Sequence, residues 1–424
     1  MAVCFFDDNY DESYECDYTV KKYNIEVIVN YEIDKEIEPD NNGVKSFGLN
    51  TKFKDRDILI IDYKNKKNVL LKDAYYCGHT NVWGTPDGGS KAKFSSRYYF
   101  CDKNYDKLCN LKKTPKVSKI RMYSGLINEL IGHPSLFEEE VGDEFVIKLK
   151  RNTIRKNIIL GINNIKEIIL SDDWSHIHSY KNNDISIKLT GYLEIVLNKR
   201  INYYDIYDYI KETMVYLQLI RPNKLKIDKI TVFIDDAYYE LSIPINELEY
   251  SDKYISNSVS TDFIEFLTKC YNLIPYRKSK SEIRNIPYII FETSRNLEDN
   301  FLMFYKFIEC YYKKQNITTN FISYSIINNY KKSSTMRNEE IENLSQEIIC
   351  LRNHYVHSGY FLKNDSLKIN FKKVGRKSNP KNYTVNKIEV DWIYEKTKIL
   401  YEIVIDIIFK NMLNFEQYKF EKKF

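Results

Sequence analysis

The spacing of apolar residues divides the chain into two regions with different periodicities. In the first two-thirds, apolar and polar residues alternate over short runs, which is typical of strands with one buried face. These runs cover residues 23–33, 58–63, 145–149, 184–197, 229–234 and 238–245. One helix interrupts them, since Ile206, Ile210, Met214 and Leu217 recur at helical spacing. A second helix is expected after residues 260–262, where Ser, Thr and Asp can cap a first turn.

The later part of the chain has helical periodicity throughout. Apolar residues recur at intervals of three or four within residues 297–311 and 341–355. Residues 392–413 are apolar on much of a helical circumference, and Asp391 is the expected cap of that helix. A shorter helix is expected at residues 321–330. Four such helices predict a bundle.

These two regions give the predicted fold class and domains. A chain of 424 residues is too long for one compact core. The basic, apolar-poor residues 276–285 are the expected linker. We therefore predict an α+β protein, with a β-rich region over residues 1–280 that has room for two subdomains. An all-helical domain follows over residues 286–424.

A basic segment is inserted into the helical region at residues 361–390. It holds eight Lys or Arg residues against two acidic ones. Its runs SLKINFKKV and NYTVNKIEV predict two short strands of a hairpin. Lys372, Lys373, Arg376 and Lys377 surround the expected turn and are candidate RNA contacts. The alternative is a basic face that is simply solvated.

Composition narrows the class of protein only slightly. A net charge of +5 is too small to indicate a protein that coats nucleic acid. None of the eight cysteines forms a CxxC pair, and the acidic N-terminus lacks the features of a secretion signal. No apolar run is long enough to span a bilayer. We expect a cytoplasmic protein with free thiols, no membrane partner, and neither a metal site nor a cofactor.

The segment 351–359, LRNHYVHSG, carries the clearest candidate chemistry. Its Arg352 and His357 are separated by four residues, and the polar Asn353 follows the arginine directly. RNA can be cleaved by attack of its 2′-hydroxyl on the adjacent phosphorus. Histidine can move protons at the attacking or leaving oxygen, and arginine can stabilise the crowded phosphorane. Arg352 and His357 are therefore a candidate catalytic pair.

Helical geometry constrains how this pair could act. On an ideal helix at about 100° per residue, His357 lies roughly 160° from the centre of the 341–355 apolar stripe. Asn353 shares its outward face, whereas Arg352 lies closer to the core edge. Two copies joined across a twofold axis would bring such side chains together better than one copy does. The alternative is that Arg352 is an ion-pair partner and the histidines are surface residues.

The same segment resembles the Arg-x4–6-His motif of the HEPN superfamily. The run NFLMFYKFIECYYKK resembles the first helix of HEPN domains in ApeA-like anti-phage defence proteins, and DWIYEKTKILYEIVIDII resembles their last helix. The segment GYLEIVLNKRINYYDIYDYIKETMVYLQLI resembles a strand and helix of their N-terminal regions. The likeness covers residues 290–413 well and 185–235 loosely, and none is seen over residues 1–180.

This resemblance implies a function and a set of site residues. Arg352 and His357 would be catalytic, with Asn353 assisting them, in a dimeric, metal-independent endoribonuclease of abortive infection. RNA, with tRNA as one candidate, would be the substrate, and a phage-derived trigger would act on the N-terminal region. Glu309 and His354 are candidate supporting residues. Glu309 lies off the stripe of its helix, where it either orients Arg352 or simply faces solvent.

A non-catalytic protein is the alternative hypothesis. Here the helical bundle would be a degenerate HEPN dimerisation module, and the β-rich region would recognise a protein or glycan ligand. A further possibility is the toxin half of a two-gene pair that a nucleotidyltransferase modifies.

Overall fold

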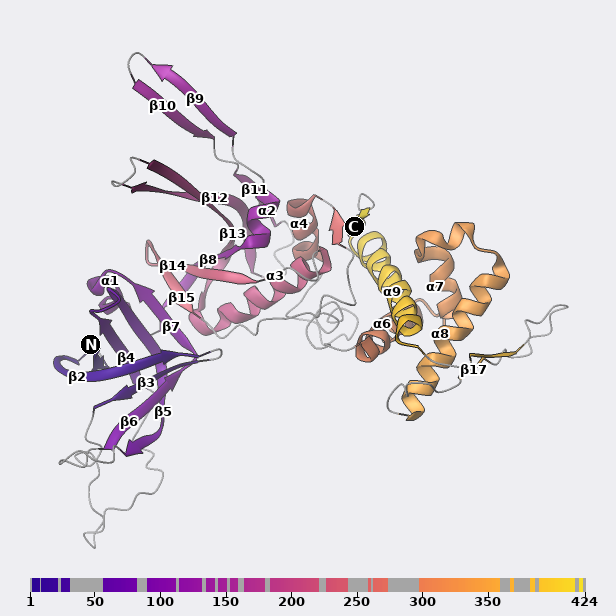
Figure 1. Ribbon diagram of the computed structural model, residues 1–424, viewed down its shortest axis with the longest axis horizontal. Coiled ribbons are helices and arrows are strands. Elements are labelled where there is room, and N and C mark those ends of the chain that lie inside the picture. The colour runs from indigo at the N-terminus through magenta and orange to yellow at the C-terminus, as the bar shows by residue number, and fades with distance from the viewer. Residues whose placement is uncertain are drawn as a thin grey trace, which may run out of the picture. The chain divides into compact units, whose positions relative to one another are not determined.

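The fold was analysed in a computed structural model of the 424-residue chain. The structure describes residues 2–7, 9–21, 24–30, 56–81, 90–111, 114–131, 135–141, 144–150, 153–158, 164–179, 184–220, 226–242, 258–260, 262–273, 297–358, 367–369, 382–385, 389–415 and 419–421. The chain forms two compact units. The first comprises Met1–Arg155, Asn164–Ile210 and Lys226–Glu247, and the second comprises Lys156–Asn163, Lys211–Leu225 and Leu248–Phe424. Strands dominate the first and helices the second, so the predicted α+β class is confirmed (Figure 1).

The strands of the first unit follow one another closely along the chain. They are β1 (Ala2–Phe6), β2 (Asn9–Val20), β3 (Ile25–Val29), β4 (Arg56–Asp62), β5 (Lys67–Asn81), β6 (Ser90–Ser96), β7 (Tyr98–Asp102), β8 (Lys116–Ser124), β9 (Ser135–Val141), β10 (Glu144–Lys150), β11 (Ile154–Asn157), β12 (Ile165–Ser179), β13 (Asp184–Asn202), β14 (Ile227–Ile234) and β15 (Ala237–Ser242). The helical segments are α1 (Tyr105–Cys109), α2 (Gly125–Ile131), a 3-10 turn at Tyr203–Asp205 and α3 (Ile206–Ile220), which both units share.

Thirteen of these strands form one sheet. Its order is β11-β12-β13-β8-β14-β15-β7-β5-β4-β1-β2-β3-β6, and β5 also pairs with β6. The strands β5, β4, β1, β2, β3 and β6 therefore close into a ring. Its interior is an apolar core in which inward residues alternate along each strand, such as Cys4, Ile25, Val27 and Phe94.

Strand β5 makes this closure possible because it changes partner along its length. Its first half pairs with β4 and β7, and its second half pairs with β6. Between the halves, Asp73 takes a positive φ of 48°, a backbone shape that marks a bend in the strand. The fully buried Tyr203 donates its hydroxyl hydrogen to Asp73 Oδ2, which fixes the bend.

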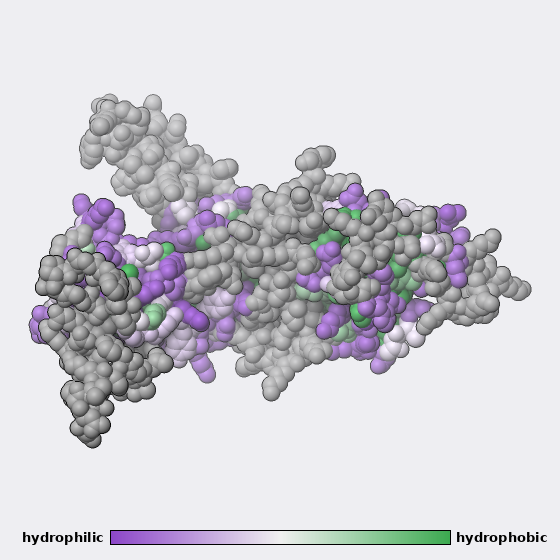
Figure 2. Space-filling model, turned by 60° about the horizontal axis from the view of Figure 1, so that its bottom comes forward, coloured by the Kyte–Doolittle hydropathy of each residue, from purple (hydrophilic) through white to green (hydrophobic). Residues whose placement is uncertain are grey.

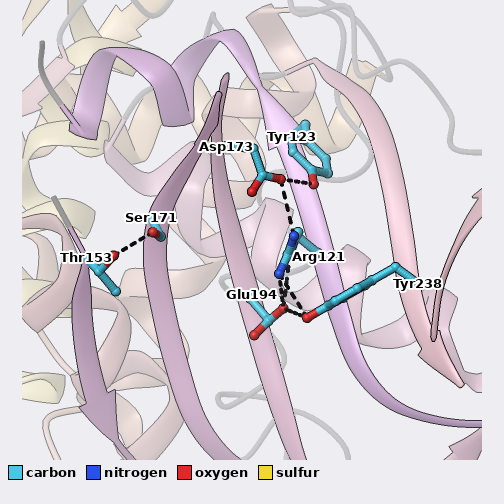
Figure 3. Close-up of polar contacts among 7 residues, drawn as sticks. All are labelled: Arg121, Tyr123, Thr153, Ser171, Asp173, Glu194 and Tyr238. Atoms are coloured by element: carbon cyan, nitrogen blue, oxygen red, sulfur yellow. Dashed lines mark hydrogen bonds and ion pairs between the residues drawn. The ribbon is translucent and has the colours of Figure 1, made fainter. Parts of the chain in front are cut away.

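A polar cluster links four strands in the other half of the sheet. Arg121 on β8 lies between the rings of Tyr192 and Tyr238, with its Cζ 3.9 and 4.1 Å from their centroids. Arg121 Nε donates to Glu194 Oε2 over 3.0 Å, and Nη1 donates to Asp173 Oδ2 over 3.2 Å. Because these side chains come from β8, β12, β13 and β15, the cluster fixes the order and register of the strands (Figure 3).

Hydroxyl groups complete this cluster. The Tyr123 hydroxyl donates to Asp173 Oδ2 over 2.8 Å. Burial raises the pKa of Tyr123 to about 12, so this hydroxyl keeps its proton at neutral pH. Apart from the cluster, the hydroxyls of Thr153 and Ser171 lie 2.7 Å from each other (Figure 3). The cluster supplies its own hydrogen-bond partners, which is the arrangement expected of a structural element rather than an open site.

The second unit contains the predicted helices and two short strand pairings. Its elements are β16 (Ser258–Ser260), α4 (Phe263–Leu273), α6 (Leu297–Lys314), α7 (Phe321–Asn329), a 3-10 turn at Lys331–Thr335, α8 (Asn338–Ser358), β17 (Leu367–Ile369), β18 (Tyr383–Val385), α9 (Val390–Asp406), a π-helical segment at Ile407–Met412 and β19 (Lys419–Glu421). Strand β17 pairs with β18 and β16 pairs with β19. The hairpin predicted within residues 361–390 is therefore confirmed by its two strands.

Apolar stripes hold the helices of this unit together. Helix α9 packs against α6, and α7 packs against both α8 and α9. The core includes Phe301 and Phe304 of α6, Ile348 of α8 and Leu400 of α9, none of which is exposed.

Three polar contacts add specificity to this packing. Asn329 Nδ2 donates to the buried Asp406 Oδ2 over 3.0 Å, and the Tyr312 hydroxyl donates to Asn329. Lys396 Nζ lies 2.7 Å from Glu347 Oε2, which ties α9 to α8.

Helix α4 differs from its predicted place. The sequence put residues 263–273 in the N-terminal region, whereas the structure groups them with the C-terminal helices. The reason is a packing contact, since the ring of Phe266 stacks on Phe409 with centroids 5.0 Å apart. The predicted cap of α4 is confirmed, because Asp262 Oδ1 accepts from the Glu265 amide. The predicted Asp391 cap of α9 is wrong: the capping position is Glu389, and Asp391 lies in the first turn. The linker expected at 276–285 lies outside the described residues.

Figure 2 shows one face of the molecule, on which the described residues are of both kinds, hydrophilic and hydrophobic. On the face shown in Figure 2, hydrophobic residues lie between hydrophilic ones in small areas. No helix in the described parts of the chain is long and apolar enough to cross a membrane.

The Arg121 cluster should contribute strongly to stability. Arg121→Met removes the cation and leaves the Glu194 carboxylate, whose side chain is only 4% exposed, without its charged partner. We expect the free energy of unfolding to fall by about 3–5 kcal/mol. Arg200→Met is the matched control, because the Arg200–Asp235 pair is 57% and 45% exposed and should contribute at most about 1 kcal/mol. Urea denaturation followed by circular dichroism measures both. Equal losses in the two variants would contradict this role.

Candidate functional site

Helix α8 carries the candidate catalytic pair, and its apolar stripe sets its rotation. Ile341, Leu344, Ile348 and Leu351 are buried and face the core of the helical unit. Near its C-terminal end, the Tyr355 hydroxyl lies 3.4 Å from Asp299 Oδ1 in the first turn of α6. These contacts fix which residues of the final turns face outward.

The motif residues fall on two different faces of this helix. Asn353 and His357 are exposed, and Val356 between them is 52% exposed. Arg352 is half-buried and lies toward α6. The outward position predicted for His357 and Asn353 is therefore what the structure shows, as is the position of Arg352 near the core edge. His354, the other expected supporting residue, is half-buried.

Two neighbours hold the Arg352 guanidinium. Its Nη1 donates to Asn353 Oδ1 over 3.0 Å, and its Cζ lies 5.6 Å from the centroid of the Tyr305 ring on α6. A cation at this distance is attracted by the negative face of an aromatic ring. Arginine has five N–H donors, and within the described residues one hydrogen bond of this guanidinium is seen, which leaves other donors able to meet a ligand such as a phosphate group.

Glu309 has a different partner from the one considered in the sequence. Its Oε1 lies 2.9 Å from Lys313 Nζ, one turn further along α6. Tyr305, Glu309 and Lys313 follow one another at intervals of four residues, so they form a row on one side of the helix. Arg352 lies over the first member of this row, and Glu309 pairs with the last.

Lys313 and Tyr305 are site residues that the sequence analysis missed. The ion pair with Glu309 raises the pKa of Lys313, and the nearby Arg352 charge opposes that rise. Burial raises the pKa of Tyr305 to about 12, against the opposing effect of Arg352, so its ring stays uncharged at neutral pH. One feature of the sequence could have indicated them. Tyr305, Glu309 and Lys313 recur every four residues, which places them together on one side of α6.

One copy of the chain does not bring Arg352 and His357 together. Five residues along an α-helix correspond to a rotation of about 140°. Arg352 points toward α6, whereas His357 points to solvent in the last turn of α8. The predicted way to bring both groups to one phosphate is a second copy that docks on the exposed face formed by Asn353, Val356 and His357.

The predicted RNA contacts of the hairpin cannot be placed. Lys372, Lys373, Arg376 and Lys377 lie outside the described residues. Strand β17 of the same hairpin contacts α8.

Comparison with known proteins leaves the function to be argued from these residues. No protein-family model, curated protein or solved structure matches the chain. The HEPN resemblance therefore continues to rest on the motif and on the two helix patterns given above.

Proposed function

We propose that this protein is a metal-independent endoribonuclease of the HEPN type that acts in anti-phage defence by cutting RNA. The observation that carries the proposal is the state of Arg352. Its guanidinium is half-buried on α8, lies against the Tyr305 ring and is bonded to Asn353, while His357 is exposed on the same helix. A positioned cation and an accessible imidazole are two groups that can accelerate RNA cleavage without a metal ion.

The chemistry assigned to each group follows from its type. The 2′-hydroxyl gives up its proton to a base and attacks the adjacent phosphorus, and the 5′-oxygen leaves with a proton. The imidazole of His357 serves this transfer, because imidazole accepts and donates protons near neutral pH. Arg352 stabilises the negative charge on the phosphorane oxygens. The products are a 2′,3′-cyclic phosphate and a 5′-hydroxyl.

The proposal includes a twofold dimer formed by the outward face of α8. A twofold axis beside Val356 would place His357 of each copy near Arg352 of the other. Val356 would then be covered by the partner, and a single exposed apolar residue becomes part of an interface. Lys313, held by Glu309, adds a second positive charge on the side of α6 where Arg352 lies.

The role of the strand-rich unit follows only from the resemblance, whereas that of the basic hairpin follows from its charge. The strand-rich unit would sense a phage-derived trigger or restrain the nuclease until infection. The basic hairpin that contains β17 and β18 would contact the RNA backbone.

Replacing either member of the pair tests the activity. Arg352→Ala and His357→Ala should each lower RNA cleavage in EDTA by about 10²–10⁴-fold, since one removes the charge on the phosphorane and the other removes proton transfer. Arg337→Ala is the matched control, because Arg337 lies at the start of α8 with 79% of its side chain exposed. Cleavage is followed on labelled RNA, with circular dichroism and light scattering as checks on folding and dimerisation. Equal cleavage by wild-type protein and both variants would contradict the mechanism.

A charge on the outward face of α8 tests the dimer. Val356→Asp should raise the dissociation constant of the dimer by about 100-fold or more, because two carboxylates would face each other across the axis. Val390→Asp is the control, since Val390 is 45% exposed at the start of α9, outside the proposed interface. Size-exclusion chromatography with light scattering measures both. A Val356→Asp protein that remains as dimeric as wild type would place the dimer contact elsewhere.

A further inference from the structure

Tyr305 is the aromatic residue whose ring the Arg352 guanidinium contacts. It lies in the middle of α6 and is only 7% exposed. Its ring packs edge-to-face with that of Phe321, the first residue of α7, with centroids 5.5 Å apart and planes at 75°. The ring is thus fixed by two helices before Arg352 of α8 is considered.

The face of this ring is what Arg352 meets. The guanidinium Cζ lies 5.6 Å from the ring centroid, within the range of a cation–π contact. The Arg352 charge opposes the burial-induced rise in the pKa of Tyr305, which is consistent with direct electrostatic contact. Arginine has a long side chain with many rotamers, so a fixed surface is needed to hold its planar group in one position.

The other described neighbours of Arg352 do not hold its guanidinium against another helix, as Tyr305 does. Glu309, the nearest carboxylate of the same row, is paired with Lys313 at 2.9 Å. The bond from Arg352 to Asn353 links neighbouring residues on the same helix, so it does not fix the guanidinium relative to the rest of the unit. The Tyr305 ring is the described contact that joins the guanidinium to another helix.

We propose that Tyr305 is a positioning residue that holds the Arg352 guanidinium, through the face of its ring, in the orientation needed to meet a phosphate. This inference rests on the proposed nuclease function for its consequence in catalysis, but the placement of Arg352 can be measured separately. The ring face carries the effect, and the Tyr305 hydroxyl is dispensable.

The test compares Tyr305→Phe with Tyr305→Leu in the full-length protein. Phenylalanine keeps the ring face, whereas leucine keeps an apolar side chain and loses the ring. Single-turnover RNA cleavage is one readout. The second is the rate at which phenylglyoxal, a reagent for guanidinium groups, modifies Arg352, followed by peptide mass spectrometry. Arg337 is the internal reference in the same digest, since its side chain is 79% exposed.

Phenylalanine should behave as wild type in both readouts. The Tyr305→Leu variant should cleave RNA about 3- to 30-fold more slowly. This is the rate change expected from the loss of one cation–π contact. The same variant should also speed modification of Arg352 by about 3- to 10-fold with no change at Arg337. If the leucine variant fails to fold by circular dichroism, Tyr305→Met fills the space more closely and gives the same comparison.

Other outcomes distinguish the positioning role of Tyr305 from the proposed nuclease function. Unchanged cleavage and unchanged modification in the leucine or methionine variant would overturn the positioning role. A phenylalanine variant as impaired as leucine would also overturn it, since the hydroxyl would then be the active part. Faster modification of Arg352 in a protein whose wild-type form cuts no RNA would support the placement by Tyr305 and contradict the nuclease function.

Discussion

The rotation between Arg352 and His357 on one α-helix is the constraint on which the account of this protein depends. Five residues separate them, so their side chains leave α8 about 140° apart. One points toward Tyr305 of α6 and the other to solvent. The two side chains therefore leave α8 toward different surroundings. We propose that joint chemistry takes one group from each of two copies, which would make the dimer part of the active site.

The packing of α8 in the helical unit fixes the directions in which Arg352 and His357 point. Helix α8 is held by its apolar stripe, by the contact of Tyr355 with Asp299 and by the ion pair between Glu347 and Lys396. Each of these contacts involves a different neighbouring helix or a different turn. Rotation of α8 would break them together, so the outward face stays defined. Sites on well-packed helices keep catalytic groups in place better than sites on loops do.

The sequence predicted those parts of the fold that depend on residue spacing and residue type within one helix or strand. The helices α6, α8 and α9 follow from their apolar periodicity, and the Asp262 cap follows from residue type. Strand β2 was missed, because it is acidic and Cys16 is its only buried residue among those whose burial is described. The long strand β5 was also missed, since its bend at Asp73 and its change of partner depend on strands far along the chain.

The candidate site was likewise predicted only in part from the sequence. The faces of Arg352 and His357 follow from helical angles, and the structure agrees with both. The contact of Arg352 with Tyr305 depends on how α6 packs beside α8, which residue spacing does not reveal. The partner of Glu309 was open for a similar reason. The sequence does not show whether its carboxylate pairs with Arg352 or, as the structure has it, with Lys313. The Arg121 cluster needs the register of four strands, which no local pattern supplies.

Mixing two inactive variants tests the central claim most directly. A dimer of one Arg352→Ala copy and one His357→Ala copy retains an intact arginine and an intact histidine only on different copies. If the site forms between copies, co-refolded variants should recover RNA cleavage on the order of a quarter of wild type, since about half of the dimers are mixed and each keeps one of two pairs. Differently tagged copies verify that mixed dimers form. Mixed dimers that cut RNA no faster than either parent would contradict a site shared between two chains.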